Sequence, residues 1–327
     1  MIVVTGGAGF IGSNIIWKLN KLGANNIIVV DHLDTNDKWK NLNGLQFADI
    51  YEKNNFYNLI VNEQIPFNID AIIHLGACSS TTEKDADYLV QNNFKYSMEL
   101  VKYCLPRKAR FIYASSAATY GDGENGYLDD ESSLETLRPL NMYGFSKHMF
   151  DLWAKRTFIS DKIAGLKYFN VYGPNEYHKG DMRSVVNKAF EQIQAEGKVK
   201  LFKSYNPTYK DGEQMRDFVY VQDAVDMTLY FLEHREKNGL FNVGTGNSRT
   251  WKDLITAIFN AMNLPVNIEY IDMPEYLKGK YQYFTKADIN KLKNIGYDLP
   301  ISSLEDGVAD YVKNHLAKDK YLGLFKE

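Results

Sequence analysis

A glycine-rich turn near the N-terminus limits most strongly what this chain can fold into. The segment TGGAGFIG at residues 5–12 follows the apolar run IVVT directly and opens a helical pattern, with Gly6, Gly9 and Gly12 spaced three apart. A turn of this kind packs a strand tightly against a helix and leaves backbone amides free for the pyrophosphate of a dinucleotide. The alternative is a tight strand–helix turn without a ligand. The position at the end of the first strand favours a dinucleotide site.

The second apolar run ends at Asp31, which suits the adenosine end of such a cofactor. An acid at this place accepts hydrogen bonds from the adenosine ribose, which favours NAD. His32, Lys38, Lys40 and Lys53 follow, and these side chains could instead receive the 2′-phosphate of NADP. The residues alone leave the choice between NAD and NADP open.

Short apolar runs alternate with helical patterns along the first half of the chain. Each run is almost wholly apolar instead of alternating, which is typical of parallel strands that are covered on both faces. The expected strands are 2–5, 26–31, 71–76, 110–116 and 163–170. The expected helices are 10–22, 53–63, 84–104, 142–159, 183–195, 221–236, 250–261 and 302–316. We therefore predict an α/β fold, a Rossmann-type doubly wound parallel sheet.

The pattern changes after residue 170, where loops rich in tyrosine, glycine and lysine appear at 204–215 and 276–285. They are too polar for a core and too aromatic for a flexible linker, so they indicate a smaller C-terminal α/β substrate-binding domain. The predicted division is 1–170 with 214–244 for the NADP-binding Rossmann domain and 171–213 with 245–327 for the substrate-binding domain.

Composition excludes several classes of partner. The net charge of −3 and the pI near 6.1 give no general attraction to nucleic acid or to an anionic membrane. No apolar window has the roughly 18 residues of a membrane span, and the N-terminus does not look like a secretion signal. Cys78 and Cys104 are too few for a disulfide framework and lack metal-ligand spacing. We expect free thiols, no metal site and a cytoplasmic protein.

A serine, a tyrosine and a lysine form a candidate catalytic set. Tyr143 and Lys147 lie four apart on one helical face, and Ser116 ends an apolar run 27 residues before the tyrosine. A lysine ammonium one turn away favours the phenolate form of a tyrosine and can hold the nicotinamide ribose, while the serine orients the substrate oxygen. Alone, such a Tyr–Lys pair is more often an ordinary surface pair. Together with the glycine turn it indicates hydride transfer at an alcohol carbon.

At this point the chain resembles the extended short-chain dehydrogenase/reductase family, in particular its nucleotide-sugar epimerases. Among these it is most similar to the enzymes that epimerise ADP-heptose at C6, on the motifs HLGACSSTTEKD, YASSAATYG, YFNVYGPNEYHKG, RDFVYVQD, FNVGTG and KGKYQYFTKADI. The resemblance implies interconversion of the D-glycero and L-glycero epimers of ADP-manno-heptose, tightly bound NADP with NAD as an alternative, and a role in lipopolysaccharide inner-core biosynthesis. It also implies a homo-oligomer, a pentamer by the family pattern.

The resemblance assigns roles residue by residue. The implied cofactor-binding residues are Gly6, Gly9, Phe10, Ile11, Gly12, Asp31, His32, Lys38, Lys53, Leu75, Gly76, Ala77, Cys78, Ser79, Asn92, Tyr143, Lys147 and Val171. The implied substrate-binding residues are Ser116, Asn170, Lys179, Asp181, Ser184, Lys188, Phe202, Lys203, Ser204, Tyr205, Arg216 and Tyr281. The implied catalytic residues are Ser116, Tyr143, Lys147 and Lys179.

Lys179 separates two kinds of epimerase. A 4-epimerase turns the whole pyranose ring over, so one tyrosine can serve both faces, whereas rotation about C5–C6 moves an exocyclic ketone oxygen to a new place. A second proton donor is then needed there, and a partly desolvated lysine can serve as acid and base. A phosphate-contacting or merely solvated lysine is the simpler interpretation.

Other interpretations stay open. A 4-epimerase or 4,6-dehydratase of a UDP-, GDP- or dTDP-hexose is the alternative enzyme, although Ala117 and Ala118 replace the acids that dehydratases place there. A regulator that only senses NADP should lack the catalytic tyrosine or lysine. Arg216 could bind a substrate phosphate or pair with Asp217 or Asp223.

Two histidines and several departures from the family pattern complete the sequence evidence. His74 and His178 are expected to be structural or to line the substrate site. The chain departs from the family pattern at Leu75, Asp181 and Lys188 and in a longer loop at 204–215. These departures bear on the nucleotide more than on the chemistry.

Overall fold

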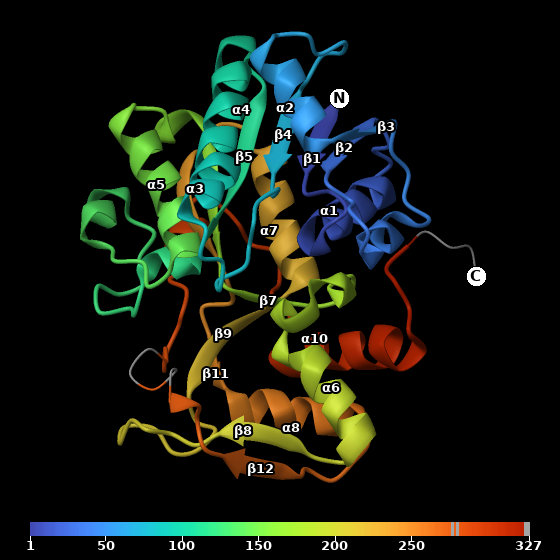
Figure 1. Cartoon of the computed structure of the whole chain (residues 1–327), viewed down its shortest axis with the longest axis vertical. Coiled ribbons are helices and arrows are strands. Elements are labelled where there is room, and N and C mark those ends of the chain that lie inside the picture. Colours follow the sequence, from blue (N-terminus) through green and yellow to red (C-terminus); the bar gives the residue numbers. More distant parts are fainter. Residues whose placement is uncertain (276–277, 279–280, 324–327) are drawn as a thin grey trace.

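The computed structural model describes residues 1–275, 278 and 281–323, and a seven-stranded sheet forms the centre of its larger half (Figure 1). The strands are β1 (Ile2–Thr5), β2 (Ile27–Asp31), β3 (Asp49–Glu52), β4 (Ala71–His74), β5 (Arg110–Ser116), β6 (Ala164–Tyr168) and β10 (Gly239–Val243). Their order is β10-β6-β5-β4-β1-β2-β3, and every neighbouring pair is parallel. The predicted doubly wound parallel sheet is confirmed.

Both faces of this sheet are covered by helices, which explains why its strands read as unbroken apolar runs. Helices α1 (Phe10–Lys21) and α7 (Val221–Glu233) cover one face; α2 (Lys53–Val61), α4 (Tyr96–Cys104) and α5 (Met142–Arg156) cover the other. Along β1, Val4 enters the core under α1 and α7, whereas Val3 enters the core under α2, α4 and α5. Alternate side chains of a strand point to opposite faces, so both must be apolar.

The smaller half lies below the sheet in Figure 1 and carries short strands with amphipathic helices. Strand β9 (Met215–Tyr220) pairs with β7 (Asn170–Tyr172) and β11 (Ser248–Thr250), and β8 (Val199–Phe202) pairs with β12 (Ile268–Ile271). Helices α6 (Val185–Glu196), α8 (Trp251–Ala261) and α10 (Leu304–Asp310) pack beside them. A capping box between Thr250 and Asp253 fixes the start of α8. The predicted domain boundaries stay a prediction.

Several elements differ from the sequence-based expectation. The run 163–170 is interrupted at Phe169: β6 ends at Tyr168, and β7 belongs to the three-stranded sheet with β9 and β11. The expected helix 84–104 consists of α3 (Ala86–Leu89), the π-helical segment η2 (Val90–Lys95) and α4; the helix at 302–316 likewise passes from α10 into the π-helical η9 (Tyr311–His315). The sequence did not predict six further strands. Four of them are short and partly exposed, namely β3, β8, β11 and β12. The other two, β9 and β10, lie within motifs that we interpreted only for function.

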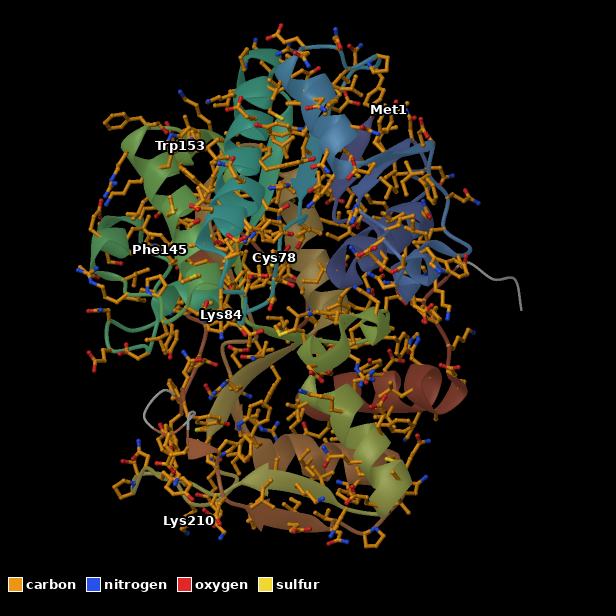
Figure 2. The ribbon with its side chains drawn as sticks, viewed as in Figure 1. Met1, Cys78, Lys84, Phe145, Trp153 and Lys210 are labelled. Atoms are coloured by element: carbon orange, nitrogen blue, oxygen red, sulfur yellow. The ribbon has the colours of Figure 1, made fainter. Side chains whose placement is uncertain are left out.

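The chain reverses direction across the sheet between β1 and β4. From β1 it proceeds outward to β2 and β3, and from β4 it proceeds to β5, β6 and β10 on the other side. Ligands of open α/β sheets bind at the carboxyl ends of the strands at such a switch point. Figure 2 labels Cys78, which follows β4 closely, near the middle of the view. Among the described helices, none has the length and apolar character needed to cross a bilayer.

Candidate active site

A cavity of about 710 Å³ opens at this switch point and holds most of the predicted site residues. Its lining combines the glycine turn, the ends of β4 and β5, the start of α5 and the segment 168–172. The predicted residues that line it are Gly6, Gly9, Phe10, Ile11, Gly12, Asp31, Lys38, Leu75, Gly76, Ala77, Cys78, Ser79, Ser116, Tyr143, Lys147, Asn170, Val171, His178, Lys179 and Ser184. The four predicted catalytic residues therefore share one cavity.

The glycine turn has the backbone shape that a dinucleotide pyrophosphate requires. Gly6 has a φ of +68°, and a Cβ at Gly12 would lie 2.1 Å from the Gly6 carbonyl oxygen. The N-cap of α1 is Gly9, which has no side chain to accept from the first amides of the helix. These amides and the positive end of the helix face the cavity, so the residues present fit a dinucleotide.

The carboxylate of Asp31 is held on three sides at the adenosine end of the cavity. It accepts from the backbone amides of Ala8 at 2.8 Å and His32 at 2.7 Å, and the Lys38 ammonium lies 2.8 Å from it. Lys38 therefore neutralises the charge of Asp31, which would otherwise repel a 2′-phosphate. Less of the carboxylate is free for a ribose hydroxyl than the sequence suggested.

A second, smaller cavity of about 170 Å³ continues from this end. His32, Lys53 and Asn92 line it together with Asp31 and Lys38. The Lys53 ammonium donates to Asn92 Oδ1 at 2.8 Å. The remaining predicted cofactor residues thus gather here. Lys40 instead pairs with Asp37 and is not part of this lining.

Ser116, Tyr143 and Lys147 come together from β5 and α5. The backbone amide of Ala118 donates to Ser116 Oγ at 3.1 Å, and Lys147 Nζ donates to the Ala114 carbonyl oxygen at 2.7 Å. Asn141 caps α5 by accepting from the Gly144 amide at 2.8 Å, which fixes the turn that carries Tyr143. Lys147 is 5% exposed, so its ammonium is well shielded from water.

Burial, more than charge, controls the titration of this set. It raises the pKa of Tyr143 above the ordinary tyrosine value, against a hydrogen bond with Ser116 that lowers the pKa. It also lowers the pKa of Lys147 to about 8, while the carboxylate of Asp151 acts in the opposite direction. The Lys147 ammonium bonds the Ala114 carbonyl oxygen in this structure, and its expected effect on the Tyr143 phenolate stays a prediction.

A buried charge network lies beneath the catalytic face of α5. Asp151 stands two turns after Tyr143 and accepts from Ser115 Oγ at 2.7 Å and the Tyr113 hydroxyl at 2.9 Å. The ammonium of Lys167 lies 3.2 Å from the same carboxylate, and its side chain is about 1% exposed. The network fastens α5 to β5 and β6 directly below the cavity.

Lys179 reaches the cavity from a 3₁₀ segment, η7 (Tyr177–Met182), which connects β7 with α6. Its ammonium lies 5.4 Å from the centre of the Phe10 ring, at the glycine turn. Burial lowers the pKa of Lys179, and the Glu176 carboxylate opposes this shift. A partly desolvated lysine at this place agrees with the expectation for an acid–base group.

Contacts from distant parts of the chain fix the segment that carries Lys179. Asn41 Nδ2 donates to the backbone oxygens of Ala8 and Asn175, which joins the segment to the glycine turn. The Leu322 amide donates to Asn175 Oδ1 at 2.8 Å, and the Tyr177 hydroxyl donates to the Lys320 carbonyl at 3.2 Å. The segment therefore rests between the cofactor turn and residues near 320.

The remaining predicted substrate residues do not line this cavity. They are Asp181, Lys188, Phe202, Lys203, Ser204, Tyr205, Arg216 and Tyr281. Asp181 is exposed, and its backbone oxygen accepts from the Lys188 ammonium at 3.2 Å. Residues 202–205 begin with the last residue of β8 in the smaller half.

Arg216 is buried beside aromatic rings. It donates to the backbone oxygens of Met215 and Gln282. Its guanidinium lies 5.6 Å from the Trp251 ring centre and 5.5 Å from that of Tyr281.

The predicted alternative, an ion pair of Arg216 with Asp217 or Asp223, is wrong, because both carboxylates bind other groups. Asp217 accepts from Thr245, Gly246 and Ala287. Asp223 accepts from Ser302 instead.

His74 has a structural role, which is one of the two roles that the sequence left open for it. Its ring bonds Thr5 Oγ1 at 2.6 Å and Ser97 Oγ at 2.8 Å, and burial lowers its pKa to about 3. His178 lines the cavity, and burial lowers its pKa to about 4. Both rings are therefore neutral at physiological pH. The thiols of Cys78 and Cys104 are free.

Sequence reasoning missed several residues that shape the cavity. Met182, Arg183 and Trp251 line it, and Glu176 lies behind Lys179 with 1% exposure. Met182 and Arg183 stand within the motif that contains Lys179, which was the available signal. The sequence carries no comparable sign that Glu176 is buried.

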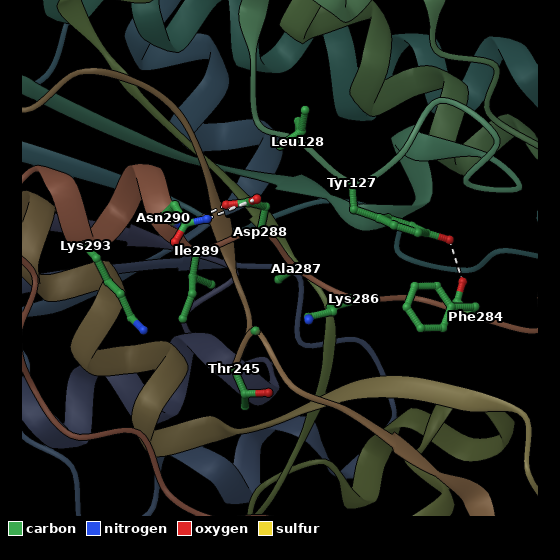
Figure 3. Close-up of a pocket in the computed structure, with 11 residues that line it drawn as sticks. Tyr127, Leu128, Thr245, Phe284, Lys286, Ala287, Asp288, Ile289, Asn290 and Lys293 are labelled. Carbon is green, nitrogen blue, oxygen red and sulfur yellow. Dashed lines mark hydrogen bonds between the residues drawn. The ribbon is translucent and has the colours of Figure 1, made fainter.

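A third cavity lies apart from these residues. It has a volume of about 440 Å³, and Figure 3 shows Lys286, Lys293 and Thr245 around it. Its lining contains none of the predicted site residues. The Tyr127 hydroxyl donates to the Phe284 carbonyl at 2.5 Å along one side. This surface therefore has no part in the predicted chemistry.

Comparison with known proteins agrees with this geometry. The sequence model described as the NAD dependent epimerase/dehydratase family matches residues 2–244. An ADP-L-glycero-D-manno-heptose-6-epimerase of Nitratidesulfovibrio vulgaris (strain DP4) is 55% identical over 317 residues, which cover 97% of this chain and 98% of that protein. The family resemblance inferred from motifs is confirmed.

Solved structures are similar over nearly the whole chain. The ADP-L-glycero-D-manno-heptose-6-epimerase of Helicobacter pylori superposes with a TM-score of 0.79 at 29% identity, covering 96% of this chain and 95% of that one. A UDP-glucuronic acid 4-epimerase of Bacillus cereus, in complex with UDP-glucuronic acid and NAD, gives a TM-score of 0.74 at 26% identity and covers 96% and 99%.

Proposed function

The chain belongs to the NAD dependent epimerase/dehydratase family, and on this basis we propose that it interconverts the D-glycero and L-glycero epimers of ADP-manno-heptose at C6. One observation carries the proposal. The cavity receives two side chains whose chemistry suits proton transfer, Tyr143 from α5 and Lys179 from η7. A single tyrosine is enough for an enzyme that turns over a whole ring, whereas an exocyclic centre needs both.

The cofactor is a nicotinamide dinucleotide, and we propose NADP in particular. When bound, it would take up the hydride from C6 and return it. The glycine turn would hold the pyrophosphate, and Asp31, Lys38 and Lys53 would surround the adenosine ribose. Lys38 already neutralises Asp31, so Lys53 provides an additional positive charge for a 2′-phosphate.

The two bases would divide the proton transfers between the epimers. As C6 is oxidised, the proton of its hydroxyl passes to one of them, either the Tyr143 oxygen or the Lys179 nitrogen. The ketone then turns about C5–C6, and the other group donates a proton to the oxygen as C6 is reduced on its opposite face. Ser116 Oγ would orient the oxygen by a hydrogen bond. Lys147 would hold Tyr143 and the nicotinamide ribose.

Replacing Lys179 by Met tests whether Tyr143 and Lys179 each transfer the proton for one epimer. We expect epimerisation to be lost while the purified protein keeps its bound cofactor, because the glycine turn is unchanged. The measurement is NMR of the product after incubation with ADP-D-glycero-D-manno-heptose. Lys198→Met is the matched control, since Lys198 pairs with Glu269 outside the cavity. Full activity of the Lys179 variant would refute the proposal.

Cofactor choice has its own test. Lys53→Met should weaken binding of NADP at least tenfold, the equivalent of one charge-assisted hydrogen bond, and leave binding of NAD nearly unchanged. Titration of cofactor-free protein with each dinucleotide measures both effects. Equal losses for the two dinucleotides would exclude a contact with the 2′-phosphate.

A nucleotide-sugar 4-epimerase is the second candidate, favoured by the similar fold of the UDP-glucuronic acid 4-epimerase. Turnover of a UDP-hexose without turnover of the ADP-heptose would select it. For the 6-epimerase we propose that Arg216 and Tyr281, with Asp181, Lys188 and residues 202–205, reach the ADP-heptose when the substrate binds.

The wider setting of the enzyme is also a proposal. The product would supply lipopolysaccharide inner-core biosynthesis in the cytoplasm. We propose 1–170 with 214–244 as the cofactor domain and 171–213 with 245–327 as the substrate domain. We also propose a homo-oligomer, such as a pentamer; its contacts would cover exposed apolar side chains such as Phe145 of α5, which is 53% exposed (Figure 2).

A further inference from the structure

The segment that carries Lys179 is closed at its base by a buried carboxylate. Glu176 immediately precedes η7, and its carboxylate accepts from the Ser184 amide at 2.5 Å and from Ser184 Oγ at 2.6 Å. The backbone oxygen of Glu176 also accepts from the Lys179 amide at 3.0 Å. One residue therefore holds the start of the segment, its catalytic lysine and its far end.

The carboxylate lies where a charge has a strong effect on its surroundings. Glu176 is 1% exposed, and burial raises its pKa, while the hydrogen bonds from Ser184 and Tyr311 lower it. An uncompensated carboxylate at such a depth would be costly, and these donors together with the Lys179 ammonium compensate it. Burial acts on Lys179 in the same way and favours its neutral form. Each group favours the charged form of the other.

We propose that Glu176 is a positioning residue that keeps Lys179 protonated and directed into the cavity. The inference rests on the proposed function of Lys179. Burial alone would favour the neutral amine, which could accept a proton but could not donate one. With the carboxylate behind it, the ammonium persists to higher pH and can protonate the ketone oxygen of the substrate. Glu176 itself touches neither substrate nor cofactor in this arrangement.

The other charged groups around the segment are compensated or neutral. On the glycine-turn side, Lys38 is paired with Asp31 at 2.8 Å. His178 has a pKa near 4 and is neutral. At the far end of the segment, Arg183 pairs with Glu191.

Further groups on the neighbouring elements are also accounted for. Lys40 pairs with Asp37 at 2.9 Å. Lys188 donates to the backbone oxygen of Asp181, whose carboxylate is exposed beyond the cavity.

Three tyrosines and one lysine are further titratable groups around the segment, and Tyr321 and Asp319 face Tyr177 from the C-terminal side. Burial raises the pKa of Tyr177, of Tyr311 and of Tyr143, so these hydroxyls stay protonated in the neutral range. Lys147, in the same cavity, has a pKa of about 8. Its titration will contribute to any pH profile of activity. The decisive measurement must therefore follow Lys179 itself.

The experiment measures how the reactivity of Lys179 depends on pH in the intact protein with its cofactor. Brief acetylation with acetic anhydride between pH 6 and 10 modifies only neutral amines, and peptide mass spectrometry gives the extent at Lys179. The pH at which Lys179 is half-maximally acetylated is its midpoint. In Glu176→Gln this midpoint should fall by about one pH unit or more, because an opposite charge has been removed while the volume and shape of the side chain are kept. Glu191→Gln is the matched control and should leave the midpoint unchanged.

Activity profiles separate this inference from the function on which it rests. With Glu176→Gln, the pH profile of epimerisation should move to lower pH, a change that a purely structural role would not produce. Lys179→Met should be inactive at every pH. Full activity of Lys179→Met would refute the two-base function. If Lys179→Met is inactive but Glu176→Gln leaves the pH midpoint of Lys179 acetylation unchanged, only the role of Glu176 is overturned.

A second variant covers the case in which Glu176→Gln does not fold. Glu176→Asp keeps the charge but withdraws it from Lys179 by one methylene. The midpoint of Lys179 should then fall in the same direction by a smaller amount. A midpoint equal to that of the wild type would overturn the inference.

Discussion

Replacing Gly12 by Ala should remove the cofactor while leaving the fold in place. A Cβ at this position would lie 2.1 Å from the Gly6 carbonyl oxygen and 2.8 Å from the Cα of Gly7. Both are backbone atoms of the glycine turn, so no side-chain rotation can relieve the contact. Ordinary contact starts near 3.4 Å, and the turn and helix α1 must therefore separate by 1.3 Å.

A displacement of this size exceeds what the hydrogen bonds to a pyrophosphate tolerate. Such bonds span about 2.7–3.2 Å between donor and acceptor, so amides that move by 1.3 Å lose them. Two charge-assisted bonds contribute about 3–6 kcal/mol together. Binding of the dinucleotide should weaken by about 100-fold or more.

The assay compares the cofactor content of purified proteins and the dissociation constant from calorimetric titration. Gly197→Ala is the control, because Gly197 has a φ of +67° but no atom within 4 Å of an added Cβ. It should lower the melting temperature slightly through backbone strain and leave cofactor binding unchanged. A Gly12→Ala protein that retains its cofactor at the wild-type level would show that the turn does not hold the pyrophosphate.

Three further predictions follow from other residues. Tyr143→Phe should lower the rate of epimerisation by a factor of about 10²–10⁴ with the cofactor still bound, and an unchanged rate in a product assay would remove Tyr143 from the acid–base role. Lys167→Met leaves the buried Asp151 carboxylate uncompensated and should cost about 3–5 kcal/mol of unfolding free energy in a denaturant titration; the double variant with Asp151→Asn should recover part of it. Burial raises the pKa of Asp129 to about 6 from 3.8, so its contribution to stability is complete below pH 4 and disappears as the pH rises through 6. Asp129→Asn should therefore gain melting temperature relative to the wild type between pH 4 and 7, by the equivalent of about 3 kcal/mol at most, and a difference that does not vary with pH would contradict this origin.

The sequence was most informative where local pattern alone decides the structure. Val3 and Val4 must both be apolar because the two faces of β1 are both covered, so the strand could be recognised without knowing its neighbours. The glycine turn was equally clear, since its spacing reflects contacts within a few residues, such as that between Gly6 and Gly12. The fold class and the cofactor turn follow from such signals.

Features that depend on distant contacts were not predictable. The sequence left open whether Arg216 binds a substrate phosphate or pairs with a neighbouring acid, and it could not show the bond to the backbone oxygen of Gln282, which is 66 positions away. Glu176 is buried, and Tyr311 acts on its pKa from a distant part of the chain, yet neither residue carries a pattern that points to the other. Residues 202–205 were expected to bind substrate but lie outside the cavity lining. The conformation of their loop decides which side chains reach the cavity, and the sequence does not reveal it.

The support of the Lys179 segment by residues near 320 has a consequence for the synthesis of the protein. Asn175 receives its hydrogen bond from Leu322, which is added 147 residues later. At the usual 5–20 residues per second, about 7–30 seconds separate the two on the ribosome. When the interval begins, strands β1 to β6 of the parallel sheet and the glycine turn have already been synthesised, while the segment that brings the second base lacks this support. A nascent chain can thus offer a place for the dinucleotide well before it can complete an epimerisation.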